Sequence, residues 1–131
     1  MTEFVALTRH RIDAAALEEW LERARTALAP MAVQPGCLGG EVCVSVDDPD
    51  LLVFITRWES VGAFRRGMSA FEVKLHSVPF LYTALDEPSA FEVLHHNGPA
   101  GPVDNVSARA ADADTIGLGT AAAQHVPPRG L

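Results

Sequence analysis

The 131-residue chain has few basic residues, a single lysine and no long apolar segment. Ten basic residues stand against 17 acidic ones, which gives a net charge of -7 at pH 7, and Lys74 is the only lysine. Because no run of basic side chains is present to neutralise phosphates, the sequence argues against nucleic-acid binding. The same negative charge argues against attachment to an anionic membrane surface.

Segments that would enter or cross a membrane are also missing from the sequence. The longest apolar run, 51–55, has five residues, and runs such as 14–17 have four, whereas a transmembrane helix needs about 20. The first residues lack a basic segment followed by an apolar core, which is the pattern of a secretory signal. We therefore expect a cytoplasmic protein without a membrane partner.

Cysteine is scarce, and the histidines do not form a chelating pattern. Cys37 and Cys43 would share a face of one strand and stand about 20 Å apart, too far for a disulfide. Two thiols alone do not make a metal site. His95 and His96 are adjacent, so on a strand they point to opposite faces and cannot hold one ion together. The sequence therefore predicts free thiols and no metal site.

The periodicity of apolar residues divides the chain into a body, residues 1–96, and a C-terminal segment, residues 97–131. The C-terminal segment is rich in Ala, Gly and Pro and has no aromatic residue. Such a composition cannot bury enough surface to order itself alone. We predict that this segment is extended, either alone or packed on the body or a partner subunit.

The body alternates between strand and helix patterns. Period-two alternation predicts strands, and apolar residues at helical spacing predict amphipathic helices. The predicted elements are strand 2–11, helix 17–31, strand 37–46, strand 51–59, two helical stretches after Ser60, and strand 88–96. The order β-α-β-β-α-β predicts an α+β, ferredoxin-like fold with one antiparallel sheet.

Three local signals refine these elements. Pro30 is expected to end or kink the first helix. The pair Gly39–Gly40 predicts a bulge or a close backbone approach in the second strand. Asp47–Asp50, with the sequence Asp-Asp-Pro-Asp, predicts the turn of a hairpin.

Both faces of the predicted sheet are apolar. In the first strand Phe4 and Ala6 lie on one face, and Val5 and Leu7 lie on the other. Helices on one side of an antiparallel sheet cover a single face. We therefore predict a homodimer in which the second apolar face packs against its copy.

Three short motifs occur together in the body. They are Gln34–Cys37 (Gln-Pro-Gly-Cys), the turn Asp47–Asp50, and Arg57–Ser60 (Arg-Trp-Glu-Ser). In this order and spacing the chain resembles the antibiotic biosynthesis monooxygenase family over residues 2–95. The resemblance implies a dimeric α/β barrel with a ligand pocket between the sheet and the helices of each subunit.

The pocket implied by this resemblance is apolar and aromatic, which suits a flat aromatic ligand. Trp58 is expected to stack on the substrate. His76 is the candidate base that removes a proton before an electron passes to oxygen. The residues expected to bind the substrate are Thr8, Phe54, Thr56, Phe64, Met68 and Tyr82.

The chain departs from each branch of the family at polar positions. Haem-degrading members use an asparagine, a tryptophan and a histidine, which match Thr8, Gly67 and His76. Anthrone-oxidising members place an asparagine four residues before the motif tryptophan and a tyrosine six after it, where this chain has Phe54 and Phe64. The histidine of quinol-oxidising members falls at Gly67.

The leading hypothesis is a small monooxygenase that oxidises an anthrone- or hydroquinone-like aromatic or polyketide-type substrate with O2, without a tightly bound cofactor. Since fold does not fix function, a non-catalytic ligand-binding or cyclase-like protein is an alternative that the missing polar residues favour. A haem-binding protein with His76 as iron ligand is a further alternative. Reduced flavin supplied by a partner would leave no motif.

Overall fold

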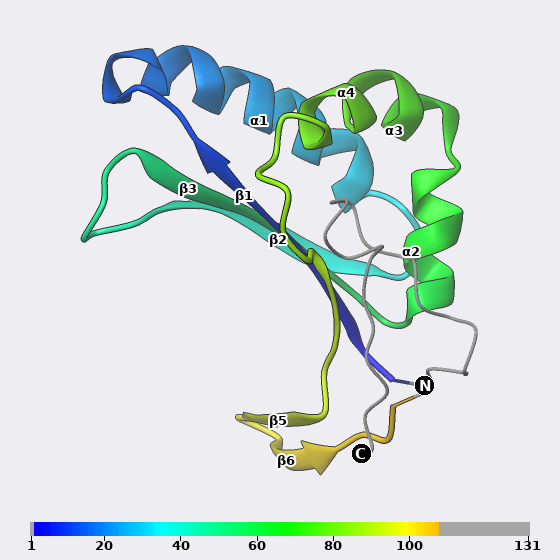
Figure 1. The fold of residues 1–131 in the computed structure, drawn as a ribbon. Coiled ribbons are helices and arrows are strands. Elements are labelled where there is room, and N and C mark those ends of the chain that lie inside the picture. The colour runs from blue at the N-terminus through cyan, green and yellow to red at the C-terminus, as the bar shows by residue number, and fades with distance from the viewer. Residues whose placement is uncertain (1, 108–131) are drawn as a thin grey trace.

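The computed structural model describes residues 2–107 and contains a four-stranded antiparallel sheet with helices on one face (Figure 1). The order in the sheet is β2–β3–β1–β4. The strands are β1 (Phe4–Arg11), β2 (Cys37–Val44), β3 (Leu51–Trp58) and β4 (Ala90–Glu92). The helices are η1 (Ala14–Ala16), α1 (Leu17–Ala32), α2 (Val61–Met68), α3 (Phe71–His76) and α4 (Val78–Leu81). The predicted α+β, ferredoxin-like order is confirmed.

The core lies between the sheet and the helices, as the alternation on β1 and β3 dictates. These strands pair in antiparallel register from Phe4 opposite Trp58 to Arg11 opposite Leu51. Their inward residues, each at most 4% exposed, are Phe4, Ala6, Thr8, His10, Leu52, Phe54, Thr56 and Trp58. One stripe of α1 is buried with them: Trp20, Ala24, Ala27 and Met31. The burial of this apolar face is the main driving force for the fold.

The first helix runs past its proline. Pro30 lies in the last turn of α1, which continues to Ala32. Of the two expected effects, an end or a kink at Pro30, the first is therefore wrong. Proline lacks the backbone N–H that would bond four residues back, so α1 loses one helical hydrogen bond at this position. The Gln34 side chain donates a hydrogen bond to the Pro30 carbonyl (3.1 Å) and thereby satisfies a carbonyl at the helix end.

Two of the family-like motifs meet in space. Gly36 adopts a φ of 86°, and its carbonyl accepts a hydrogen bond from the Glu59 N–H (2.8 Å). A Cβ added at Gly36 would lie 2.6 Å from the Ala63 Cβ. Ser60 caps α2 by accepting from the Ala63 N–H (3.1 Å). These motif residues therefore fix how α2 leaves β3, which is a structural role.

Because of the predicted bulge in the second strand, the two cysteines lie on opposite faces of the sheet. Cys37 lies opposite Trp58 and Gly39 lies opposite Arg57, so one extra residue is inserted in β2. An inserted residue moves every later side chain to the other face. Cys37 consequently faces the core, whereas Cys43 lies opposite Val53 on the open face and is exposed. The expectation that both thiols share a face is wrong, although both are free, as predicted.

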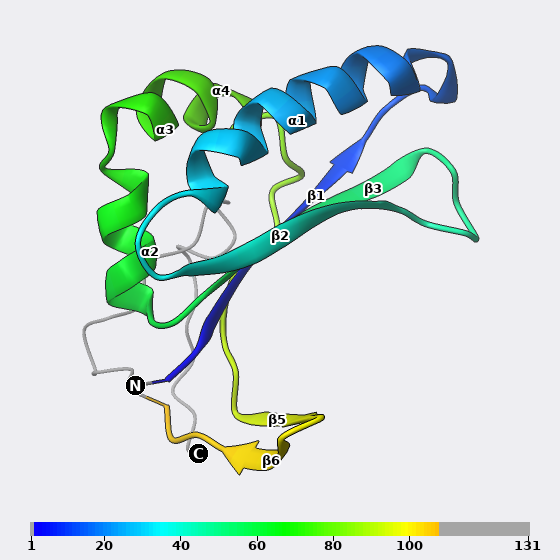
Figure 2. The ribbon, with the colours of Figure 1, turned by 180° about the vertical axis from the view of Figure 1, so that it is seen from behind.

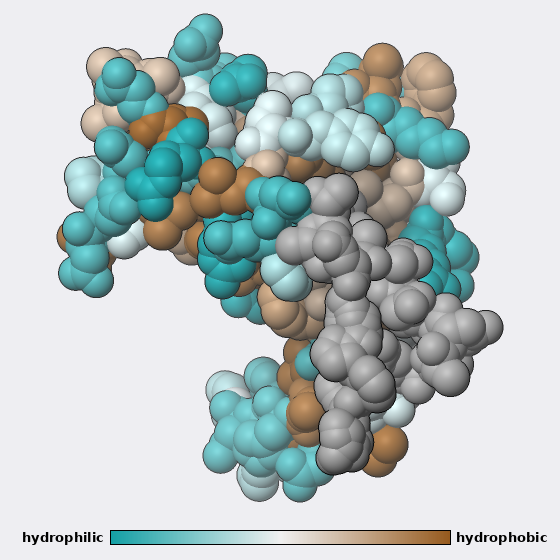
Figure 3. All heavy atoms as spheres, in the orientation of Figure 1, coloured by the Kyte–Doolittle hydropathy of each residue, from teal (hydrophilic) through white to brown (hydrophobic). Residues whose placement is uncertain are grey.

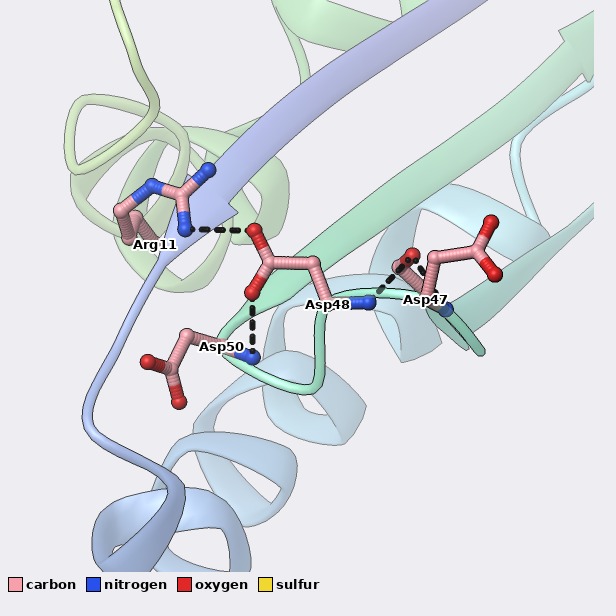
Figure 4. A network of polar contacts seen from close by, with 5 residues as sticks. Arg11, Asp47, Asp48 and Asp50 are labelled. Atoms are coloured by element: carbon pink, nitrogen blue, oxygen red, sulfur yellow. Dashed lines mark hydrogen bonds and ion pairs between the residues drawn. The ribbon is translucent and has the colours of Figure 1, made fainter.

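The predicted turn between β2 and β3 is confirmed and is organised by side chains (Figure 4). Ser45 Oγ accepts from the backbone N–H groups of Asp47 and Asp48. The Asp48 carboxylate accepts from the Asp50 N–H (3.2 Å) and from Arg11 (2.9 Å). The hydrogen bond from Arg11 lowers the pKa of Asp48. The turn is therefore tied to the end of β1.

The last predicted strand is broken into two parts. β4 ends at Glu92, and a second, two-stranded sheet follows, formed by β5 (His95–Gly98) and β6 (Gly101–Asp104). This hairpin projects from the body on the side away from α1 (Figures 1 and 2). The glycines on either side of its two-residue turn permit the tight reversal, with Gly101 at a φ of 99°. The predicted boundary at residue 97 thus falls inside β5, and residues 108–131 lie outside the described residues.

The helices of residues 2–107 leave the second face of the sheet uncovered. Val5, Leu7, Val53 and Ile55 point to this face and are partly exposed. The space-filling view shows a recess between the β2–β3 end of the sheet and the projecting hairpin (Figure 3). No helix within residues 2–107 has the length and apolar character needed to cross a membrane.

Candidate active site

The region between sheet and helices, where the sequence predicts the pocket, is packed with side chains. Thr8, Phe54, Thr56, Trp58 and Phe64 are each at most 3% exposed. Aromatic rings are in contact there: the centroids of Trp58 and Phe64 are 5.6 Å apart. The structure therefore brings these five predicted residues together as part of the core.

Trp58 is held in this core by two neighbours. Its Nε1 donates a hydrogen bond to Thr56 Oγ1 (2.8 Å). A Cβ added at Gly67 would lie 2.7 Å from the six-membered ring of Trp58. The indole thus occupies the space that a side chain at position 67 would need.

His10 is a buried titratable residue that the sequence did not single out as part of a site. Its Nε2 lies 2.8 Å from Thr8 Oγ1, and its Nδ1 lies 3.3 Å from Thr83 Oγ1. The Thr83 hydroxyl donates its hydrogen to the Phe80 carbonyl (2.7 Å), so Nδ1 is the ring nitrogen that donates to Thr83. Burial, with a smaller contribution from the nearby Arg23 charge, lowers the pKa of His10 to about 4. The ring is therefore neutral at pH 7.

Aromatic packing connects His10 to α4. Its ring stacks on Phe80 with centroids 4.9 Å apart and lies 5.4 Å from Trp20. The alternation of β1 places position 10 on the same face as Phe4 and Ala6, so the sequence contained the signal for burial. What the sequence could not supply was the aromatic and hydroxyl surroundings, because they come from α1, α4 and the loop after it.

The largest of three cavities described at the surface lies among α2, α3 and α4. We call it the α2–α4 cavity; its volume is about 430 Å³, and its lining residues are Met68, Lys74, Val78, Leu81 and Tyr82. Its walls are apolar, and its polar groups are one ammonium and one phenol. Two residues predicted to bind the substrate, Met68 and Tyr82, are brought together here. Tyr82 is 77% exposed and so lies at the rim.

His76 belongs to a different surface. The α1–α4 groove, about 280 Å³ in volume, is lined by Glu22, Arg23, Thr26, His76, Pro79 and Phe80. Nε2 of His76 lies 3.3 Å from a carboxylate oxygen of Glu72. The third cavity, about 210 Å³, lies at the end of β1 and β3 and is lined in part by Trp58 and His96. His76 and Trp58 therefore do not line one common cavity among these three.

Cofactor-binding groups are sparse in residues 2–107. No group of three or more His, Cys, Asp and Glu side chains in this part of the chain is arranged to hold a metal ion. Burial raises the pKa of the Cys37 thiol, which disfavours the thiolate needed for metal binding. The imidazole of His76 is half-exposed beside Glu72, in an open surface groove. These features do not fit an enclosed haem site.

Strand order and helix placement define a ferredoxin-like α+β domain, with the α2–α4 cavity at its surface. The model of the antibiotic biosynthesis monooxygenase family matches residues 3–72, more than half of the chain. The chain belongs to this family. No match is found among curated proteins.

Solved structures share the fold at low sequence identity. A conserved protein from Bacteroides thetaiotaomicron has a TM-score of 0.59 and 14% identity, over 70% of this chain and 98% of that one. A Mycobacterium tuberculosis protein gives 0.55 and 16%, over 80% and 99%. A protein described as an antibiotic biosynthesis monooxygenase gives 0.51 and 20%, over 82% and 100%. Likeness at this level of identity establishes the fold and leaves the reaction open.

Proposed function

We propose that this protein is a small oxygenase that oxidises an anthrone- or hydroquinone-like aromatic substrate in the α2–α4 cavity, without a tightly bound cofactor. The observation that carries the proposal is the cavity of about 430 Å³ in a chain of the antibiotic biosynthesis monooxygenase family. Apolar walls with a few polar groups are typical of a site for a drug-sized, flat ligand. Lys74 would stabilise negative charge that develops on the substrate.

For an anthrone-type substrate the reaction consumes one O2 and releases one water. The ring CH2 loses a proton to solvent water at the rim, and the resulting carbanion transfers an electron to O2. The two radicals combine, and protonation of the peroxide gives a hydroperoxide with a new C–O bond. Cleavage of its O–O bond, with loss of the remaining C–H proton, releases water and leaves a carbonyl. The carbon loses four electrons, and one oxygen atom ends in the carbonyl and the other in water.

The assignment of His76 as base and Trp58 as stacking residue, made from the sequence, is a rival proposal for the same reaction. It would place the chemistry in the α1–α4 groove, where His76 lies. The α2–α4 cavity is lined from the other side of the same short helices, by Lys74 and Val78. Variants of His76 and Lys74 therefore separate the two locations.

Oxygen uptake with an anthrone, with chelator present and no flavin added, tests the proposal. We expect uptake by the wild type and a loss of about tenfold or more in kcat for Lys74→Met, because a charge that stabilises the anionic intermediate is removed. His76→Ala should stay within about twofold of the wild type. The opposite pattern would place the base at His76, and absence of uptake by the wild type would contradict the oxygenase proposal.

A non-catalytic ligand-binding protein is the second candidate function. Its support is the packed core at the positions where anthrone-oxidising relatives carry polar groups: Phe54 and Phe64 are both at most 3% exposed. A protein of this kind would bind the aromatic molecule in the α2–α4 cavity without consuming oxygen. Saturable binding measured by calorimetry, together with an uptake rate no higher than buffer, would favour this candidate.

We also propose that the uncovered sheet face packs against a second copy of the chain. The face presents partly exposed aliphatic side chains, including Val53 and Ile55, and Phe91 is 41% exposed on the adjoining β4. A recess lies between the β2–β3 end of the sheet and the β5–β6 hairpin (Figure 3). Contiguous apolar patches of this kind mark association surfaces.

A charge placed on that face should abolish the dimer. In light scattering coupled to gel filtration we expect the wild type at twice the 14.0 kDa chain mass and Ile55→Glu at the single mass, because a buried unpaired charge is costly. Leu75→Glu, on the exposed side of α3, is the matched control and should remain dimeric. Circular dichroism must show that Ile55→Glu is folded. A monomeric wild type contradicts the proposal.

A further inference from the structure

We propose that the α2–α4 cavity recognises a hydroxylated aromatic ligand in its ionised form, as phenolate or enolate, through Lys74 and Tyr82. The inference rests on the proposed function for the location of the substrate, and it adds which chemical form of the substrate is bound. The binding itself involves no oxygen and no turnover, so it can be measured separately from the reaction.

Lys74 supplies a cation that lacks a carboxylate partner within the described part of the chain. By contrast, three arginines on the sheet form ion pairs with carboxylates: Arg9 with Glu87, Arg11 with Asp48 and Arg57 with Glu41. Within residues 2–107 no such ion pair involves Lys74, the only lysine of a chain whose net charge is -7. Its ammonium therefore has no carboxylate partner within residues 2–107 to give up when an anion binds.

The walls of the cavity strengthen the attraction between this ammonium and a bound anion. Met68, Val78 and Leu81 are apolar, and Leu81 is only 2% exposed. Lys74 itself is exposed, so the ion pair would lie at the surface with apolar side chains on one side. There the effective dielectric constant is about 20, and a charge pair is still worth more than in bulk water. An opposite charge close to an acidic hydroxyl favours its ionised form, with a typical pKa decrease of about 1–3 units.

The polar groups of the cavity suit a single oxygen atom better than a carboxylate. An ammonium acts as a compact point charge, whereas carboxylates are preferentially held by the two parallel N–H groups of a guanidinium. The phenol of Tyr82 can donate one further hydrogen bond to the same oxygen. The ionised hydroxyl is also the electron-rich form that passes an electron to O2. Selection of this form would therefore favour ligands with an acidic hydroxyl over neutral aromatics of the same shape.

Spectrophotometric titration of alizarin, a hydroxyanthraquinone whose visible band shifts on ionisation, tests the inference under anaerobic conditions. We expect the apparent pKa of the bound dye to lie about 1 unit or more below that of the free dye. Lys74→Met should remove this shift while the dye still binds, Lys74→Arg should restore most of it, and Tyr82→Phe should reduce it. Arg65→Met removes the same charge from α2 outside the cavity lining and should leave the shift unchanged.

An unshifted dye pKa in the wild type would overturn the inference, and so would an equal shift in Lys74→Met and wild type. Lys74-dependent binding of anthraquinone-2-carboxylate that is tighter than binding of alizarin would also overturn it, in favour of a carboxylate site. A dye shift without anthrone oxidation would leave the inference standing and contradict the oxygenase proposal. Anthrone oxidation without a dye shift would support the oxygenase proposal and contradict the inference.

Discussion

The free energy of unfolding is expected to fall by about 3 kcal/mol as the pH is lowered from 6.5 to 4, because His10 is buried in its neutral form. The pKa of His10 is about 4 in the folded chain and 6.5 in its ordinary state. Between these values the unfolded chain binds a proton that the folded chain does not. Each unit by which the pH is lowered between 6.5 and 4 therefore lowers the free energy of unfolding.

The free energy of unfolding decreases throughout the range as the pH is lowered from 6.5 to 4. Above pH 6.5 the histidine is neutral in both states, and its full contribution to stability is present. Below about pH 4 it is protonated in both states, and no further loss arises from it. Asp48, whose pKa is lowered from 3.8 by Arg11, contributes stability that is lost only at still lower pH. The two titrations therefore fall in separate pH ranges.

Urea denaturation at fixed protein concentration and a series of pH values measures this effect. His10→Gln does not titrate and can still hydrogen-bond to the hydroxyls of Thr8 and Thr83, so its profile should be flatter by about 3 kcal/mol between pH 6.5 and 4. His96→Gln, at an exposed position on the hairpin, is the control and should keep the wild-type profile. Identical profiles for His10→Gln and wild type would show that His10 is not buried as a neutral ring.

Gly67→Ala is expected to destabilise the protein by about 1–3 kcal/mol, although alanine is a better helix former than glycine. The new Cβ would lie 2.7 Å from the ring of Trp58, a distance that forces the ring or α2 to move. The ring cannot move freely, because Nε1 is bound to Thr56 and Phe64 packs against it. Overpacking should therefore outweigh the gain in helix propensity.

A double-mutant cycle with Trp58→Phe isolates this steric contact. Phenylalanine lacks the outer ring atoms of the indole that approach position 67, so Gly67→Ala should be neutral or slightly stabilising in that background. Chemical denaturation of the four proteins gives the coupling free energy, for which we expect about 2 kcal/mol. Equal costs in the two backgrounds would mean that the alanine acts through the backbone of α2. Trp58→Phe alone provides the reference for the lost indole.

The same contact bears on how this chain relates to its family. A tryptophan or histidine at position 67, as in the haem-degrading and quinol-oxidising branches, has no space beside Trp58. Phe54 likewise packs 5.1 Å from Phe80 in the core, where the anthrone-oxidising branch would carry a hydrogen-bonding group. These departures support a ligand position outside this core, at the α2–α4 cavity.

Local chemistry allowed the sequence to determine most of the fold. Alternation along residues 4–11 and 51–58 fixes which side chains are buried, because successive residues of a strand point to opposite faces. Asp47–Asp50 and Ser60 specify a turn and a helix cap through bonds to nearby backbone groups. The division of the last strand escaped prediction, since Val93 and Leu94 continue the apolar pattern while the chain leaves the main sheet there.

Only the tertiary structure decided where a ligand can bind. The sequence places Trp58 on a strand and His76 on a helix, as observed, but in the tertiary structure Trp58, His76 and Tyr82 line three different cavities. Whether an inward side chain fills the core or lines a cavity depends on the distance between layers, and no short-range pattern encodes this distance. The same is true of His10: its burial follows from strand alternation, whereas its neutral charge depends on the surroundings supplied by α1, α4 and the loop that follows α4.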